Sequence, residues 1–169
     1  MTTNSSPQEN LPALRAQYRE QKSILMQGLQ QPGATARSVR KVLHQLSQLA
    51  DALLCKIWRH AGLAAPLALL AVGGYGRLEL FPYSDVDVLV MLPDSETSDD
   101  AVEHKSRIES FIGACWDVGL EIGSSVRTLS NCLSEAHGDV TVQTALLECR
   151  WIAGDTGLVD AFQKAFFAA

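Results

Sequence analysis

The chain has 169 residues, of which 47% are hydrophobic and 20% charged, and this length and composition suit one globular domain with its own core. Its net charge is −5, from 14 basic and 19 acidic residues, and no lysine- or arginine-rich stripe occurs, so we expect no nucleic-acid partner. The longest apolar stretch, Ala61 to Val72, contains Gly62 and Pro66 and is too short to cross a bilayer, so we expect no membrane partner.

The amino-terminal third predicts a tail and two helices. Residues 1–10, MTTNSSPQEN, predict a flexible tail without the basic-then-apolar pattern of a signal peptide, which favours a cytoplasmic location. From Leu11 apolar residues recur at helical spacing until Pro32-Gly33, where we expect the helix to end. A second such pattern runs from Thr35 to Gly62. Residues 11–62 are therefore predicted to form a helical pair.

Two strands are predicted next. The run LALLAV, Leu67 to Val72, is short and apolar and leads into Gly73-Gly74, as a buried strand does before a turn. The run DVDVLVML then alternates with the period of a strand. One of its faces carries Val86, Val88 and Val90, and the other carries Asp85, Asp87, Leu89 and Met91.

The remaining elements complete an α/β order. A third helix is predicted from Thr97 or Ser98 to Gly119, and LEIGSSVRT predicts a third strand. From Leu129 on, the pattern predicts short helices broken at Gly138 and Gly154. This order predicts an α/β protein in which helices flank a small mixed sheet.

The chemistry of the chain is indicated by Asp85 and Asp87, two carboxylates on one face of an apolar strand. Nothing basic on the strand offsets their charge, and two neighbouring carboxylates repel each other. A divalent cation resolves this conflict, and Mg²⁺ commonly binds one or two carboxylates together with substrate phosphates. The alternative is structural: Asp85 caps a turn after Ser84, and Asp87 faces solvent on an edge strand.

The Gly73-Gly74 turn, twelve residues before the aspartates, favours the metal interpretation. Glycines let a backbone approach phosphates closely. A strand, a glycine turn and a strand with Asp-x-Asp place a triphosphate beside metal ligands, as nucleotidyl transfer requires. Ser84 is a candidate hydrogen-bond donor to the phosphates. Arg77 is a candidate phosphate ligand, although a salt bridge to Glu79 explains it equally well.

The run AVGGYGRLELFPYSDVDVLVML resembles the nucleotidyltransferase signature of the bacterial PII uridylyltransferase/uridylyl-removing enzymes, which have a polymerase-β-like fold. The downstream runs WDVGLEIGSSVRTLSNCL and DVTVQTALLECRWIAGD also resemble that family. The resemblance implies that UTP donates UMP to a tyrosine of the nitrogen-signalling protein PII, with release of pyrophosphate. It implies that Gly73 and Gly74 bind the nucleotide and that Asp85 and Asp87 hold Mg²⁺.

The resemblance also implies a division of the chain. Residues 63–155 are expected to form the nucleotidyltransferase core, and residues 156–169 to begin a further helical region. The run LVDAFQKAFFAA, from Leu158, carries an apolar stripe at helical spacing, which we expect following helices or another copy of the chain to cover. The uridylyl-removing HD domain and the ACT sensor domains would lie beyond Ala169. We therefore expect an amino-terminal fragment with weak transfer activity or none.

Two departures from the family pattern concern the site. The family usually has glycine where this chain has Leu78, and histidine where it has Ser124. A third carboxylate often completes such sites, and Glu121 is the candidate here, with a solvent-facing role as the alternative. Two other functions also fit these residues: a nucleotidyltransferase that adenylylates a protein or small molecule, and a degenerate module that binds nucleotide or PII without transfer.

Overall fold

The computed structural model of the protein describes residues 10–29, 33, 35–95 and 98–168. The predicted tail up to residue 9 lies outside the described residues. So do Pro32, at the predicted end of the first helix, and Thr97, one of the two predicted starts of the third helix. The helices and strands, in chain order, are α1 (Leu11–Leu29), α2 (Ala36–His60), β1 (Ala68–Ala71), α3 (Gly73–Gly76), β2 (Val86–Leu92), α4 (Ser98–Asp117), β3 (Ile122–Thr128), α5 (Leu129–Gly138), α6 (Val140–Leu147), β4 (Arg150–Gly154) and α7 (Thr156–Ala168).

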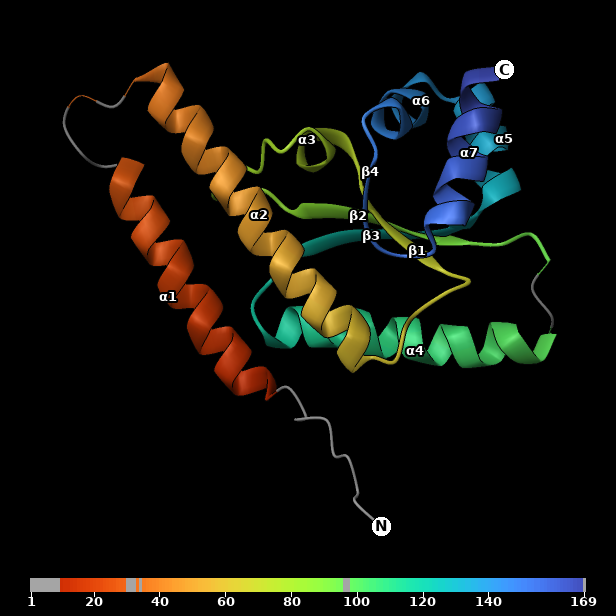
Figure 1. Cartoon of the computed structure of the whole chain (residues 1–169), viewed down its shortest axis with the longest axis horizontal. Coiled ribbons are helices and arrows are strands. Elements are labelled where there is room, and N and C mark those ends of the chain that lie inside the picture. The colour runs from red at the N-terminus through yellow and green to blue at the C-terminus, as the bar shows by residue number, and fades with distance from the viewer. Residues whose placement is uncertain (1–9, 30–32, 34, 96–97, 169) are drawn as a thin grey trace, which may run out of the picture.

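The amino-terminal helices α1 and α2 lie side by side along one side of the molecule (Figure 1). Helix α2 begins at a capping box, in which the Thr35 hydroxyl accepts a hydrogen bond from the Ser38 amide and the Ser38 hydroxyl accepts one from the Thr35 amide. Its buried stripe runs from Val42 to Trp58 and faces the sheet. Both predicted helices are present, as Leu11–Leu29 and Ala36–His60.

The sheet has four strands in the order β3-β2-β1-β4. Strand β1 pairs antiparallel with β2 and β4, and β2 pairs parallel with β3. This confirms the predicted α/β arrangement with a small mixed sheet. Strand β2 is internal, so the alternative in which Asp87 lies on an edge strand is wrong.

Strand β4 corrects the sequence prediction, which assigned only short helices after Leu129. Its five residues, Arg150 to Gly154, form an edge strand against β1. The run RWIAG is too short to display a period of two, and its pairing depends on β1, about eighty residues earlier in the chain. No local pattern identifies such a strand.

Helices cover both faces of the sheet, and the strand residues alternate between two cores. On the face of α1, α2 and α4 lie Leu69, Val86, Val88 and Val90. On the face of α5, α6 and α7 lie Ala68, Leu70, Leu89 and Met91. The predicted division of β2 into a valine face and a face shared by Asp87 and Leu89 is therefore present. Within the described parts of the chain, no helix has the length and apolar character needed to span a membrane.

Most of the apolar stripe of α7 packs against the core of this chain, although the sequence led us to expect that following helices or another copy would cover it. Val159 and Phe162 are buried, and Leu158 and Phe166 pack partly against the same core. Helix α7 contacts β1, β4 and α5. Phe167 is the exception, with 69% of its surface exposed.

Candidate active site

A cavity of about 370 Å³ opens on the α6 side of the sheet. Its walls come from the end of β1, from β2, from β3 and from α6. The lining residues are Val72, Gly73, Asp87, Val88, Leu89, Gly123, Ser124, Ser125, Arg127, Thr141, Val142, Ala145 and Leu146. Gly73 and Asp87 are fourteen residues apart in the chain, and they meet in one cavity large enough for a nucleotide.

Gly73 supplies bare backbone to this cavity. It has a positive φ of 57°, and a Cβ atom built at this position meets no heavy atom within 4 Å. Val72, just before it, donates its amide to the Asp87 carbonyl oxygen (3.1 Å), which continues the pairing of β1 with β2. The glycine turn is therefore anchored beside Asp87 and leaves open space where a phosphate group could approach.

Asp87 is the exposed residue within a strand whose other residues are buried or half-buried. Its pKa is raised above the ordinary value, first by partial burial and then by the negative charge of Asp85. From the part of the chain that the structure describes, no hydrogen bond or ion pair reaches either carboxylate. Two adjacent carboxylates without a cationic partner are the donor set that a divalent cation favours.

Asp85 lies one residue before β2 and is exposed, outside the lining of the cavity. The parallel register of β2 and β3 gives Asp87 a different neighbour, Gly123. A Cβ atom at Gly123 would lie 2.5 Å from the Asp87 Oδ1 atom. The missing side chain at position 123 therefore leaves the space that the Asp87 carboxylate occupies.

We predict that Gly123→Ala lowers nucleotidyl transfer about tenfold or more, because the new methyl group displaces the Asp87 carboxylate. Only the end of a flexible side chain must move, so the free energy of unfolding should change by less than about 1 kcal/mol. Steady-state transfer rates and denaturant unfolding measure the two effects. Gly113→Ala is the control, because a Cβ there meets nothing within 4 Å. Equal transfer by both variants would contradict the role of Gly123.

Three other predicted nucleotide ligands do not line the cavity. Arg77 pairs with Glu79 (3.0 Å) and with Glu148, which favours the salt-bridge interpretation of this residue. The Ser84 hydroxyl donates to the Phe81 carbonyl oxygen (3.0 Å). Gly74 lies within α3, beside Gly73. The structure therefore brings together Gly73 and Asp87, but not Gly74, Arg77 or Ser84, around the cavity.

Glu121 lines a second, smaller hollow of about 120 Å³, together with Tyr18 and Ser84. The pKa of Tyr18 is raised to about 12, first by burial and then by the charge of Glu121. Among the described residues, no group of three or more His, Cys, Asp or Glu side chains could hold a metal ion. Asp85, Asp87 and Glu121 thus do not form a three-carboxylate site in this structure.

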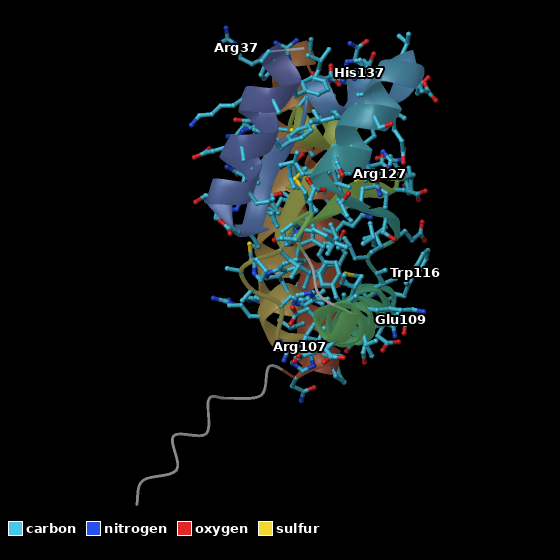
Figure 2. All side chains as sticks on the ribbon, turned by 90° about the vertical axis from the view of Figure 1, so that its right-hand side faces the viewer. Arg37, Arg107, Glu109, Trp116, Arg127 and His137 are labelled. Carbon is cyan, nitrogen blue, oxygen red and sulfur yellow. The ribbon has the colours of Figure 1, made fainter. Side chains whose placement is uncertain are left out.

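Arg127 is a cavity residue that the sequence reasoning missed. It lies on β3 at the register of Met91, four residues along from the pair Asp87 and Gly123. Its guanidinium is held by Glu135 of α5 (2.9 Å), and Figure 2 shows it beside the α5 ribbon. The sequence held one signal for it: Arg127 follows Gly123 by an even number of residues, so the two lie on the same face of the strand. Only the parallel register of β2 and β3 shows that this is also the face of Asp87.

Of the two departures from the family pattern, one lies at the cavity. Ser124 is exposed and lines it. Leu78 follows the glycine turn with a φ of 64°, and it is the one residue other than glycine with a positive φ in the described ranges. The left-handed conformation costs a residue with a Cβ atom about 1–2 kcal/mol. The turn therefore keeps a backbone shape suited to glycine although leucine occupies it.

We predict that Leu78→Gly changes the free energy of unfolding by less than about 1 kcal/mol. Relief of the left-handed strain offsets the lost contacts of the half-buried side chain and the extra freedom of glycine in the unfolded chain, about 0.4–1 kcal/mol. Denaturant titration measures the change. Leu49→Gly is the control, since Leu49 is also half-buried but lies within α2, and it should lose about 2 kcal/mol. A similar loss at Leu78 would contradict the strain.

Comparison with known proteins agrees with this geometry. Residues 54–144 match the family model described as a nucleotidyltransferase domain. Bifunctional uridylyltransferase/uridylyl-removing enzymes of Burkholderia lata and Burkholderia vietnamiensis are 46% and 48% identical to the chain over all of its length. That of Burkholderia thailandensis is 48% identical over 94% of the chain. The chain spans about a fifth of the length of these relatives.

The family match covers the glycine turn, both aspartates and the strand opposite them. Together with the small mixed sheet flanked by helices, it confirms the polymerase-β-like nucleotidyltransferase fold. The similarity to the uridylyltransferases extends beyond the matched domain to both ends of the chain. The chain therefore belongs to the nucleotidyltransferase domain family, and its resemblance to the uridylyltransferase/uridylyl-removing enzymes is confirmed.

Proposed function

We propose that this domain transfers the UMP group of UTP to a tyrosine hydroxyl of the nitrogen-regulatory protein PII and releases pyrophosphate. The observation that carries the proposal is the cavity in which the bare backbone of Gly73 opens beside the carboxylate of Asp87. In this cavity the Gly73 backbone can contact the phosphates, and the Asp87 carboxylate can bind the cation that accompanies a nucleoside triphosphate. The names of the relatives, uridylyltransferases at 46–48% identity, support UTP as the donor.

The transfer is an in-line displacement at phosphorus. The tyrosine oxygen bonds to the α-phosphorus of UTP, and the bond from that phosphorus to the oxygen bridging to the β-phosphate breaks. Pyrophosphate leaves, and the tyrosine proton passes to solvent. In this proposal the backbone of Gly73 and Gly74 binds the phosphates. Ser84 donates a hydrogen bond to the phosphates and Arg77 is a further phosphate ligand, both from positions outside the lining of the cavity.

Asp85 and Asp87 fit Mg²⁺ because they are acidic, adjacent and without a cationic partner among the described residues. We propose that both hold the ion, with the phosphates of UTP completing its ligands. When bound, Mg²⁺ supplies positive charge that stabilises the negative charge developing on the phosphates. The two carboxylates position this charge beside Gly73.

We place the catalytic core within residues 63–155. In chain order it comes after the helical pair of residues 11–62 and before the helix that begins at Thr156. We further propose that the protein acts in the cytoplasm, where UTP is available. The proposal concerns transfer alone. Uridylyl removal and the sensing of nitrogen status are not assigned to these residues.

A labelling assay tests the proposal. The protein is incubated with PII and either UTP or ATP labelled at the α-phosphate, with Mg²⁺ or with a chelator. We expect label from UTP on PII, none with the chelator, and none on a PII variant whose acceptor tyrosine is phenylalanine. Equal labelling from ATP would identify an adenylyltransferase. Nucleotide binding without any labelling would identify a binding module.

A further inference from the structure

Behind the glycine turn, on the side away from the cavity, three side chains from three elements form one polar cluster. Arg150 of β4 donates two hydrogen bonds to Asp51 of α2, from Nη1 to Oδ2 (2.8 Å) and from Nη2 to Oδ1 (3.0 Å). The hydroxyl of Tyr75, within α3, donates to the Asp51 Oδ1 atom. A two-point contact between guanidinium and carboxylate fixes orientation as well as distance.

The same arginine also contacts the backbone of the turn. Its Nε atom donates to the Gly76 carbonyl oxygen (3.4 Å), and Nη2 lies within 3.5 Å of the Tyr75 carbonyl oxygen. The guanidinium carbon of Arg150 is 5.5 Å from the centre of the Tyr75 ring. Arg150 therefore connects the Asp51 carboxylate to two carbonyl groups of α3.

Burial makes this cluster dependent on all of its members. Tyr75 is 2% exposed, and its pKa is raised, first by burial and then by the charge of Asp51, so its hydroxyl keeps the proton that it donates. Burial lowers the pKa of Arg150, but Asp51 and Tyr75 together raise it by more, so the pKa lies above its ordinary value. Removal of one side chain leaves another polar group partly buried without its hydrogen-bond partner, which is energetically costly.

The turn is thus held from one side and open on the other. Tyr75 and Gly76 are buried against the cluster. Gly73 has empty space where a side chain would project. A four-residue helical turn has too few internal hydrogen bonds to keep its shape alone. The hydrogen bond from Val72 to Asp87 holds the start of the turn, and the contacts to α2 and β4 hold its far end, so both help to fix where the Gly73 backbone lies.

We infer that Asp51, Tyr75 and Arg150 are positioning residues that hold the glycine turn in the geometry needed for the triphosphate of UTP. This inference rests on the proposed function. Asp51 and Arg150 both lie outside the residues that match the nucleotidyltransferase family model, 54–144. In this inference, helix α2 and strand β4 support the nucleotide site through these side chains, in addition to their part in the core and the sheet.

Two variants of the full chain test the inference. Tyr75→Phe removes one hydroxyl and keeps the ion pair, and Arg150→Lys keeps the charge and loses the two-point contact. For each we expect the KM for UTP and the Kd for Mg²⁺–UTP to rise about tenfold, since small displacements of binding groups are costly. A structural role alone would lower the midpoint of thermal unfolding and leave the KM of the folded protein unchanged.

Arg107→Lys is the matched control. Arg107 also joins a carboxylate, that of Glu103, to a carbonyl oxygen, that of Gly62 at 2.7 Å. It belongs to α4 and lies at the lower end of the molecule in Figure 2, well below Arg127 of the cavity. This variant should keep the KM for UTP. A rise in KM equal to that of Tyr75→Phe would overturn the inference.

Amide hydrogen exchange separates this inference from the proposed function. The amides of Gly76, Arg77 and Glu79 form the hydrogen bonds of the turn, and in Tyr75→Phe they should exchange about tenfold faster while β2 exchanges at its original rate. Unchanged exchange in the turn would overturn positioning by the cluster, whatever the activity. An unmodified protein that transfers no UMP would overturn the proposed function, and the exchange result would still decide the positioning.

Discussion

Asp87→Asn should lower UMP transfer at least about a thousandfold while the protein remains folded. The amide keeps the shape of the side chain but loses the negative charge that we assign to the metal. Loss of about 4 kcal/mol of transition-state stabilisation corresponds to this factor, and metal coordination supplies stabilisation of that size. The rate of label transfer from UTP at saturating Mg²⁺ measures the loss.

The same variant should unfold at the same temperature as the original protein, or higher, in metal-free buffer. Burial and the charge of Asp85 raise the pKa of Asp87, so near neutral pH the ionised carboxylate opposes folding and the neutral amide removes that opposition. The control is Asp94→Asn. Asp94 accepts hydrogen bonds from the Ser130 amide (3.0 Å) and hydroxyl (2.7 Å), and its pKa is lowered mainly by the first.

Asp94→Asn should therefore lose stability and keep transfer, the reverse of Asp87→Asn. The two variants together distinguish a carboxylate that stabilises the fold from one that is needed for the reaction. An Asp87→Asn protein that is unfolded, or one that transfers at a near-normal rate, would contradict the catalytic assignment.

The parts of the fold that the sequence predicted are those with a local signal. The period of two in β2 separated Val88 from Asp87 and Leu89, and the structure places these residues on opposite faces. The start of α2 near Thr35 was predicted from the apolar period that follows it. Strand β4 had no comparable signal, because its length and its pairing come from the tertiary structure.

The candidate site divides in the same way. Gly73 and Asp87 were predicted because strand, turn and strand are contiguous in the chain, and the structure places both around the cavity. Arg127 and Gly123 become neighbours of this site through the parallel pairing of β2 with β3, which sequence spacing does not give. Asp51 and Arg150 are ninety-nine residues apart, so only the folded chain shows that they meet behind the turn.

Gly76→Ala should destabilise the fold by at least about 3 kcal/mol, the other large effect that we expect. A Cβ atom at this position would collide with the Glu148 carbonyl oxygen, and it would lie 3.0 Å from the Glu148 carbonyl carbon and 3.2 Å from the Ala71 carbonyl oxygen. All three are backbone atoms, so no flexible side chain can move aside. The turn between α6 and β4, or α3 itself, would have to shift.

Gly74→Ala is the matched control, with the same substitution two residues earlier in the same turn. Its Cβ atom would meet the Arg77 Nη2 atom at 3.6 Å and the Glu79 carbonyl oxygen at 3.7 Å, both ordinary contacts. We expect this variant to keep its free energy of unfolding within about 1 kcal/mol. Denaturant unfolding followed by circular dichroism measures both variants. A Gly76→Ala protein as stable as Gly74→Ala would show that Glu148 and the glycine turn are not packed backbone to backbone, and the arrangement that places Gly73 beside Asp87 would have to be revised.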